Sequence, residues 1–371
     1  MIFNRHLNEN SPVAPKKTTH SNSGHRNNEK RGFQPKRKLT DASDIRTVTI
    51  YLKKNHFVGS ALIVKNDRFL YRKAFGYANY DQHIKNKTTS QFQILSIQKS
   101  LTAACIMKLI QEKRLSLKTP LSRFYPHIPN SNHIRIRNVL DMNSGLSMNG
   151  AGSNKQLSER KVVRYATNHL LSHERMYGQW RYQPVNYVLL AGIISRLMRT
   201  SYHQYFDKTL IKPLKLKNSG FVQNQPLTAN KTMGYCYLSS SQVTPNYQKP
   251  FQESLSAMNN ELGTGQVYMS AFDLFKVEHA LLRGKIISSA NVKRLHKPGN
   301  PSTYGGGVYN QSNGIRSHGV GYGYEASILI SRNGKTGVVL LSNDYRPAVS
   351  IQDLAITLFD KVMTNRVKPL K

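Results

Sequence analysis

Apolar residues in this 371-residue chain gather into short runs near its two ends, separated by a long stretch of mixed character. Runs that are rich in β-branched and aromatic residues and bounded by turn residues are typical of strands. Strands are therefore expected at 57–65, 68–78, 304–309, 325–331 and 336–342. Asn66-Asp67 and Asn333-Gly334 occupy two of the gaps, where such residues favour tight hairpin turns.

Three segments have helical character instead, at about 43–55, 94–114 and 349–365. Ser43 can cap the first of them through its side-chain oxygen. The second contains LTAACIMKLI (101–110), which is apolar on nearly every side. A helix of that kind is buried, so this one is expected at the centre of the fold.

The order of these elements predicts an α/β fold of the α+β kind. An antiparallel sheet built from both ends of the chain is flanked by terminal helices, and a mostly helical lobe is inserted between them. Residues 1–42 are almost free of large apolar residues and are expected to form a disordered basic linker. Residues 43–371 then form one domain, with a sheet lobe at about 43–90 and 301–371 and a helical lobe at about 91–300.

Charge narrows the choice of partner. Lys and Arg number 54 against 19 Asp and Glu, a formal net charge of +35. Nine basic and three acidic residues fall in 1–42, so +6 lies there and +29 lies in the remainder. A folded body this basic is expected to meet a polyanion, namely nucleic acid, an anionic membrane face or an anionic cell-wall polymer. No RNP, zinc-finger or helix-turn-helix pattern accompanies the charge, so no nucleic-acid partner is expected.

Several kinds of chemistry lack their residues. Cys105 and Cys236 form no CxxC pair, and His169 and His173 have no third ligand in view, so no metal is expected. No HExxH, Walker A or Gly-x-Ser-x-Gly motif is present, and no cofactor is expected. The chain as given shows no apolar stretch of ~18–20 residues and no signal-peptide core. Taken literally it is soluble and cytoplasmic, unless an upstream anchor has been lost.

Ser96-Ile-Gln-Lys99 opens the central helix and is one of two Ser-x-x-Lys sequences in the chain. The other, Ser158-Glu-Arg-Lys161, lies among polar residues. Helical spacing of three places both side chains on one face, so the Lys99 amine can reach the Ser96 hydroxyl. A serine hydroxyl needs such a neighbouring base to act as a nucleophile. The spacing alone does not separate this reading from an ordinary helix N-cap.

Longer blocks around this pair resemble the serine β-lactamase and penicillin-binding-protein superfamily, and more closely its class C β-lactamase-like hydrolases and esterases of the Gram-positive cell envelope. The resemblance covers about 43–365. Its ordered blocks are FQILSIQKSLTAACIMKLIQEKRLSLKTPLSRFYP (92–126), IRIRNVLDMNSGL (134–146), WRYQPVNYVLLAGIISRLM (180–198), ELGTGQVYMSAFDLFKVEHALLRGKIIS (261–288) and RSHGVGYGYEASILIS (316–331).

The resemblance implies a role for each matched position. Ser96 is the acylated nucleophile, Lys99 shuttles its proton, and Tyr182 of the second motif passes the proton to the leaving group. His318 takes the cationic position of a third motif, which lies on a strand lining the cleft. The oxyanion hole combines the backbone N–H of Ser96 with a strand N–H near Val320.

Two positions depart from the family pattern. Pro184 replaces the second-motif Asn, and a proline has no amide to hydrogen-bond a peptide-like substrate. Val320 stands at the usual third-motif glycine, and the loop after it is one residue short. Both changes affect substrate recognition rather than the nucleophile. They count against efficient β-lactamase or transpeptidase activity and leave ester hydrolysis open.

The function expected from these features is hydrolysis of D-alanyl esters on cell-envelope polymers such as teichoic acids, through an acyl-serine and without a metal. The enzyme alternative is a D-alanyl-D-alanine carboxypeptidase-like protein acting on peptidoglycan-derived substrates. The non-enzyme alternative is an inactive homologue that binds anionic wall polymer. The family implies the extracellular face of the cell envelope, and a lost upstream anchor would place the chain beside the membrane.

Overall fold

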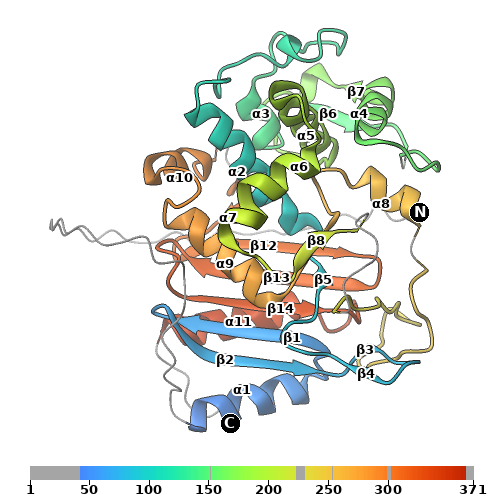
Figure 1. Cartoon of the computed structure of the whole chain (residues 1–371), viewed down its shortest axis with the longest axis vertical. Helices are drawn as coiled ribbons and strands as arrows, with labels where there is room; N and C mark the ends of the chain where they lie inside the picture. The colour runs from blue at the N-terminus through green and yellow to red at the C-terminus, as the bar shows by residue number, and fades with distance from the viewer. Residues whose placement is uncertain (1–41, 151, 223–229, 253, 299–301, 365–371) are drawn as a thin grey trace, which may run out of the picture.

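A seven-stranded sheet is the centre of the computed structural model, which describes residues 42–150, 152–222, 230–252, 254–298 and 302–364 (Figure 1). The strand order is β10-β11-β12-β13-β14-β1-β2, and every neighbouring pair is antiparallel. The strands are β1 (Gly59–Lys65), β2 (Arg68–Phe75), β10 (Tyr304–Gly305), β11 (Val308–Asn310), β12 (Gly314–Gly321), β13 (Tyr324–Ser331) and β14 (Gly337–Ser342). The expected antiparallel sheet made from both ends of the chain is confirmed.

Turn chemistry explains the hairpins. Asn66 and Asp67 both adopt positive φ angles, 51° and 62°, as a two-residue hairpin turn requires. The predicted single strand at 304–309 is wrong. Gly306 and Gly307 have φ angles of 65° and 86°, so the chain turns there and forms the β10–β11 hairpin instead. The hydrophobic pattern also misses β12, because its glycines and polar residues lack strand character.

Each face of the sheet carries its own core. One face packs against α1 (Ala42–Lys54) and α11 (Ile351–Met363) through side chains such as Ile63, Leu329 and Leu340. The opposite face belongs to a larger core shared with the helical part, which includes Leu62 and Ile328. The two sets alternate along each strand because successive side chains point to opposite faces. The predicted terminal helices are therefore confirmed as the cover of one face.

The central helix begins differently from the prediction. Residues Leu95–Ile97 form a 3-10 turn, η1, and α2 then runs over Gln98–Gln111. The segment 101–110 is buried at every position except Lys108, as its apolar character predicts. α2 packs against α5 (Val185–Met198) and lies at the centre of the larger core.

The residues between the sheet segments are mostly helical. They form α3 (Ile136–Leu140), α4 (Glu159–Asn168), α6 (Tyr202–Phe206), the π-turn η4 (Asp207–Ile211), α7 (Lys212–Leu214), α8 (Leu255–Asn260), α9 (Ala271–Leu282) and α10 (Ser289–Leu295). Short strand pairs join them, among them β5 (Phe92–Gln93), β8 (Ser219–Phe221) and β9 (Val267–Met269) in one small sheet. α9 packs on β14 and β1, although the predicted division assigns it to the helical lobe (Figure 1).

Two negative findings concern the described residues only. None of their helices is both long enough and apolar enough to cross a membrane. None of their His, Cys, Asp and Glu side chains group in threes that could hold a metal ion. The predicted linker at 1–42 lies outside the described residues, apart from the first residue of α1.

Candidate active site

The turn that carries Ser96 is held from both sides. β5 pairs with β9, and the Ile94 N–H donates to the Val267 carbonyl at 2.9 Å. Leu95 follows with a φ of 51°, a left-handed conformation that costs an L-residue roughly 1–2 kcal/mol. Leu95 is 4% exposed, so packing holds it there. The backbone therefore presents Ser96 on a constrained turn at the start of α2.

Ser96 and Lys99 meet as the spacing predicts. Lys99 Nζ lies 2.9 Å from Ser96 Oγ and also donates to the Thr264 carbonyl at 3.3 Å. Lys99 is 1% exposed, so its amine is shielded from water. Ser96 makes no N-cap hydrogen bond, and α2 begins two residues after it. The geometry places a base next to a hydroxyl, as nucleophilic catalysis by serine requires.

The second Ser-x-x-Lys sequence is different. Ser158 precedes α4, and Ser158 and Lys161 are both exposed. No hydrogen bond joins the two side chains in the part of the chain described. The same spacing therefore gives a buried pair at one site and a solvated helix face at the other.

Tyr182 stands over the lysine. Lys99 Nζ lies 5.2 Å from the centre of the Tyr182 ring, and the ring is half-buried. Pro184 then starts α5 with φ −55° and ψ −29°, a conformation suited to the first turn of a helix. Asn186 holds the same turn by donating its side-chain N–H to the Gln183 carbonyl at 2.9 Å, and its Oδ1 accepts from Ser144 Oγ at 2.6 Å. The structure thus brings Tyr182 to the Ser96–Lys99 pair.

An aromatic wall beside Tyr182 was missed by the sequence reasoning. Tyr304 lies 6.0 Å from the Tyr182 ring, edge to face. Trp180 and Tyr309 complete the group, with ring centres 6.2 Å and 5.2 Å from that of Tyr304. The available signal was the single Trp of the chain, two residues before Tyr182. Edge-to-face packing of this kind holds the Tyr182 ring in place beside the lysine.

Strand β12 passes directly against the nucleophile. A Cβ added at Gly319 would lie 2.8 Å from the Ser96 backbone nitrogen and 2.7 Å from Leu95 Cβ, which real side chains do not tolerate. The close approach therefore requires glycine at position 319. The family pattern predicts its glycine one position later, where this chain has Val320. Val320 is the next residue along the strand, and the role of its N–H in an oxyanion hole stays a prediction. The loop is short because Tyr322 and Gly323, at φ 54° and 78°, form a two-residue turn.

His318 is not brought to the Ser96–Lys99 pair. Alternation along β12 puts it on the face opposite Gly319. Its Nε2 lies 2.8 Å from Glu325 Oε1, and that carboxylate also accepts from Ser350 Oγ at 2.6 Å and from the Ile351 N–H at 3.1 Å. The predicted catalytic cation thus connects β12 to β13 and to the start of α11. Its catalytic role stays a prediction without a contact among the described residues to support it.

Glu261 supports the lysine from a second direction. Its carboxylate accepts from Thr264 Oγ1 at 2.6 Å and from the Tyr322 hydroxyl at 3.1 Å. Thr264 is the residue whose carbonyl receives Lys99. Burial and the Glu261 charge raise the pKa of Tyr322, so this hydroxyl remains a donor. The turn of the β12–β13 hairpin is thereby joined to the loop that orients the lysine.

Comparisons with known proteins identify relatives of this chain. Residues 45–361 match the family model described as Beta-lactamase. The putative penicillin-binding protein PbpX of Bacillus subtilis is 32% identical over 296 residues, which cover 80% of this chain and 73% of that protein. Protein flp of Staphylococcus aureus is 29% identical over 225 residues, or 57% of this chain and 44% of that protein.

Solved structures share the fold at lower identity. FmtA from Staphylococcus aureus gives a TM-score of 0.77 at 22% identity, covering 92% of this chain and 93% of that chain. A D-amino acid amidase from Ochrobactrum anthropi gives 0.72 at 17% identity, covering 88% of this chain and 99% of that chain. Both likenesses extend over nearly the whole chain, so the arrangement of sheet and helices is common to all three.

Proposed function

The chain belongs to the beta-lactamase family, and on that basis we propose that it hydrolyses D-alanyl esters of cell-envelope polymers, such as teichoic acids, through an acyl-serine intermediate. The observation that carries the proposal is the 2.9 Å contact between Lys99 Nζ and Ser96 Oγ, made by a lysine shielded from water. A nucleophile paired with a buried amine is the arrangement that acyl transfer needs.

The proposed reaction has two steps. Ser96 Oγ attacks the ester carbonyl while Lys99 takes the serine proton, and the negative charge that develops is received by the backbone N–H groups of Ser96 and Val320. The polymer alcohol leaves with a proton passed through Tyr182. Water then attacks the acyl-serine, D-alanine is released, and Ser96 regains its proton.

Pro184 supports an ester over a peptide substrate. A peptide-like acyl group brings an amide that needs a hydrogen-bond partner, and the proline that replaces the family Asn lacks a side-chain amide and a backbone N–H. The D-alanyl group of an ester has a free amino group and no amide, so it needs no partner for an amide. The D-amino acid amidase of the same fold acts, by its name, on D-amino acid derivatives, so a D-configured acyl group suits a site of this architecture.

Labelling by a fluorophosphonate tests the nucleophile. We expect wild-type chain to be labelled, Ser96→Ala to lose the label, and the matched Ser158→Ala to keep it because Ser158 is exposed and apart from Lys161. D-alanine release is then compared between D-alanylated teichoic acid and a muropeptide that ends in D-alanyl-D-alanine. Faster release from the muropeptide would favour the carboxypeptidase alternative, and absence of both labelling and ester turnover would leave the inactive polymer-binding homologue.

A further inference from the structure

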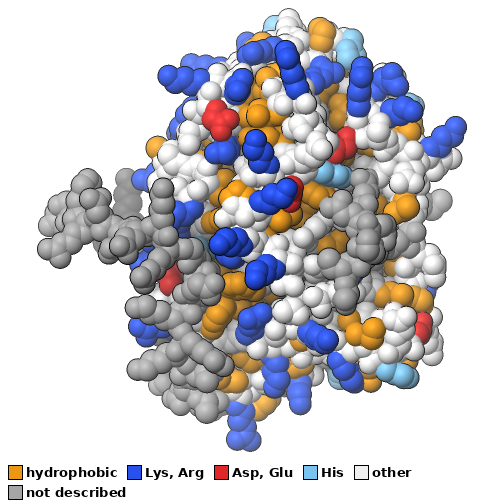
Figure 2. All heavy atoms as spheres, viewed as in Figure 1, with side chains coloured by type: hydrophobic (Ala, Val, Ile, Leu, Met, Phe, Trp, Pro, Cys, Tyr) orange, Lys and Arg blue, Asp and Glu red, His pale blue; other side chains and the backbone are white. Residues whose placement is uncertain are grey.

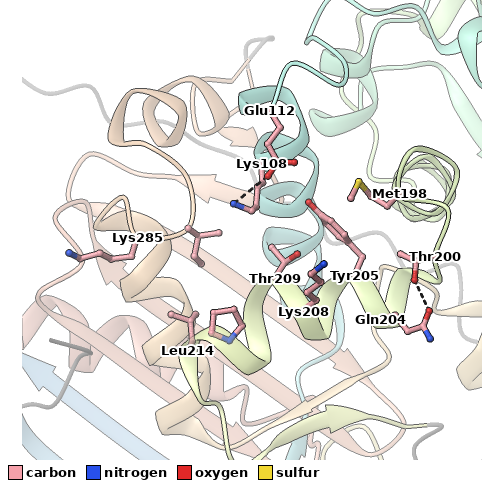
Figure 3. A pocket seen from close by; sticks show the side chains of 12 residues that line it. Lys108, Glu112, Met198, Thr200, Gln204, Tyr205, Lys208, Thr209, Leu214 and Lys285 are labelled. Carbon is pink, nitrogen blue, oxygen red and sulfur yellow. Dashed lines mark hydrogen bonds and ion pairs between the residues drawn. The ribbon is translucent and has the colours of Figure 1, made fainter. Parts of the chain in front are cut away.

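A hollow of about 490 Å³ lies at the opposite end of α2 from Ser96 (Figure 3). Four segments enclose it: the last turns of α2, the end of α5, the run α6–η4–α7, and the loop after α9. Its lining residues are Lys108, Glu112, Met198, Thr200, Gln204, Tyr205, Lys208, Thr209, Pro213, Leu214, Lys285 and Ile286. Three lysines against one glutamate make it a cationic hollow with polar and apolar walls.

The lysines of this hollow differ in their partners. Lys108 pairs with Glu112 at 3.5 Å on the same helix, as the dashed line in Figure 3 shows. Lys208 and Lys285 are exposed, and within the described ranges neither takes part in an ion pair. Each lies on a different element, η4 and the loop after α9, and both border the same hollow. Their charges are therefore available to a ligand.

More lysines continue from the hollow toward α9. Lys276 Nζ donates to the Lys215 carbonyl at 3.4 Å, which ties the end of α7 to α9. Burial lowers the pKa of Lys276, and the nearby Lys215 and Lys217 lower it further against the opposing effect of Asp273. Figure 2 shows Lys and Arg side chains gathered over α7 and α9 with few Asp or Glu between them. We call Lys108, Lys208, Lys285, Lys215, Lys217 and Lys276 the basic band.

We propose that the basic band binds the phosphodiester backbone of the polymer whose esters Ser96 hydrolyses. This proposal rests on the proposed function for the identity of the polymer. Twelve residues of the chain separate Ser96 from Lys108, which at 1.5 Å per residue is roughly 18 Å along the helix. Because α2 is buried, a ligand must pass over the surface by a longer path, which a linear polymer can span and a single small ester cannot. Lysines suit this role because they bind phosphates as hydrated point charges without demanding one fixed geometry.

Two other polyanions fit the band less well. Single-stranded nucleic acid is held by bases stacked on aromatic rings, and the wall of the hollow offers Met198, Leu214 and Pro213 with Tyr205 as its one, buried, aromatic ring. The repeating units of nucleic acid also carry no acyl ester for the serine. A membrane surface is flat, whereas the two unpaired lysines border a hollow.

Binding is measured with the Ser96→Ala chain, so that turnover does not enter. The probe is D-alanylated poly(glycerol phosphate), with double-stranded DNA and vesicles of anionic lipid as comparisons, at several salt concentrations. The test variant is Lys208→Gln with Lys285→Gln. The matched control is Lys53→Gln with Lys54→Gln, two exposed lysines on α1. The same pairs in active chain are assayed on the polymer and on a small D-alanyl ester.

We expect the test variant to bind the polymer about tenfold more weakly at low salt, with a logarithmic salt slope smaller by roughly 1.4, while the control keeps most of its affinity. Turnover of the small ester stays unchanged. The proposal would be overturned if the test and control variants lost equal affinity for the polymer. It would also be overturned if DNA or vesicles bound as tightly as the polymer and lost the same affinity in the test variant. Failure of ester turnover with polymer binding intact would instead count against the proposed function.

Discussion

At the residue scale, the site depends on Gly319, a position where any side chain would lack room. β12 approaches the Ser96 turn so closely that a methyl group at Gly319 would meet the backbone of Ser96 and the side chain of Leu95. Neither neighbour can yield easily, since one is backbone and the other is a buried residue in a left-handed conformation. β12 can lie this close to the Ser96 turn only because residue 319 has no Cβ atom.

Substituting Gly319→Ala tests this point. We expect the acylation rate to fall by about a hundredfold or more, because a misplacement of ~1 Å at a reacting group has that effect. Folded structure, followed by circular dichroism, should persist. The control is Gly220→Ala on β8, where an added Cβ meets nothing within 4 Å and labelling should be normal. A normal acylation rate in Gly319→Ala would show that β12 has room to move.

At the element scale, Glu325 joins β12, β13 and α11. Its carboxylate is 1% exposed and receives His318, the Ser350 hydroxyl and the first N–H of α11. An anion at a helix N-terminus is favoured by the helix dipole. The three contacts hold the strand beside Ser96 to the helix on the far face, so this group of residues positions the strand from behind.

Substitutions at His318 separate a structural role from a catalytic one. His318→Gln retains an N–H donor for Glu325 and should keep the acylation rate within about threefold of wild type. His318→Leu leaves the buried carboxylate short of a donor and should reduce stability by roughly 1–3 kcal/mol in urea unfolding. A loss of acylation by about a hundredfold in His318→Gln, with normal stability, would support the catalytic role that the family resemblance implies.

At the scale of the whole molecule, one buried acid makes stability depend on pH. Glu278 of α9 is 1% exposed and faces Ser100, the neighbour of Lys99. Burial raises the pKa of Glu278 from 4.5 to about 7, and the Ser100 hydroxyl opposes the shift. Between these values the unfolded chain releases the proton and the folded chain keeps it. The contribution of this group therefore becomes less favourable as pH rises from 4.5 toward 7 and stays so above that range.

Glu278→Gln removes this dependence. Between pH 4.5 and pH 8, we expect the free energy of unfolding of the variant to rise by on the order of 3 kcal/mol relative to that of wild type. Each pKa unit corresponds to about 1.4 kcal/mol. Urea unfolding of both proteins at the two pH values measures the difference. Glu174→Gln, at an exposed position, should show no such change. Parallel pH profiles for wild type and Glu278→Gln would rule out a protonated Glu278.

The sequence predicts the features that short-range pattern determines. α2 is recognisable because it is apolar all round, and the Ser96–Lys99 contact follows from helical spacing. The side of the sheet on which His318 lies depends on which residues of β12 point to each face. The motif does not predict this, because the glycine at the close approach is residue 319 and not residue 320. Trp180, Tyr304 and Tyr309 meet only through tertiary packing. The hollow of the basic band is likewise assembled from stretches that are distant in sequence, at 108–112, 198–214 and 285–286.

The left-handed turn at Leu95 also bears on when Ser96 becomes reactive during synthesis of the chain. Leu95 keeps its unfavourable backbone because Gly319 and Gly321 of β12 close over its side chain. Those glycines lie far downstream, so a chain still emerging from the ribosome has the Ser-x-x-Lys helix long before it has the strand that shapes the turn. The serine should therefore gain its reactive geometry only after β12 has been synthesised and has paired with its neighbouring strands.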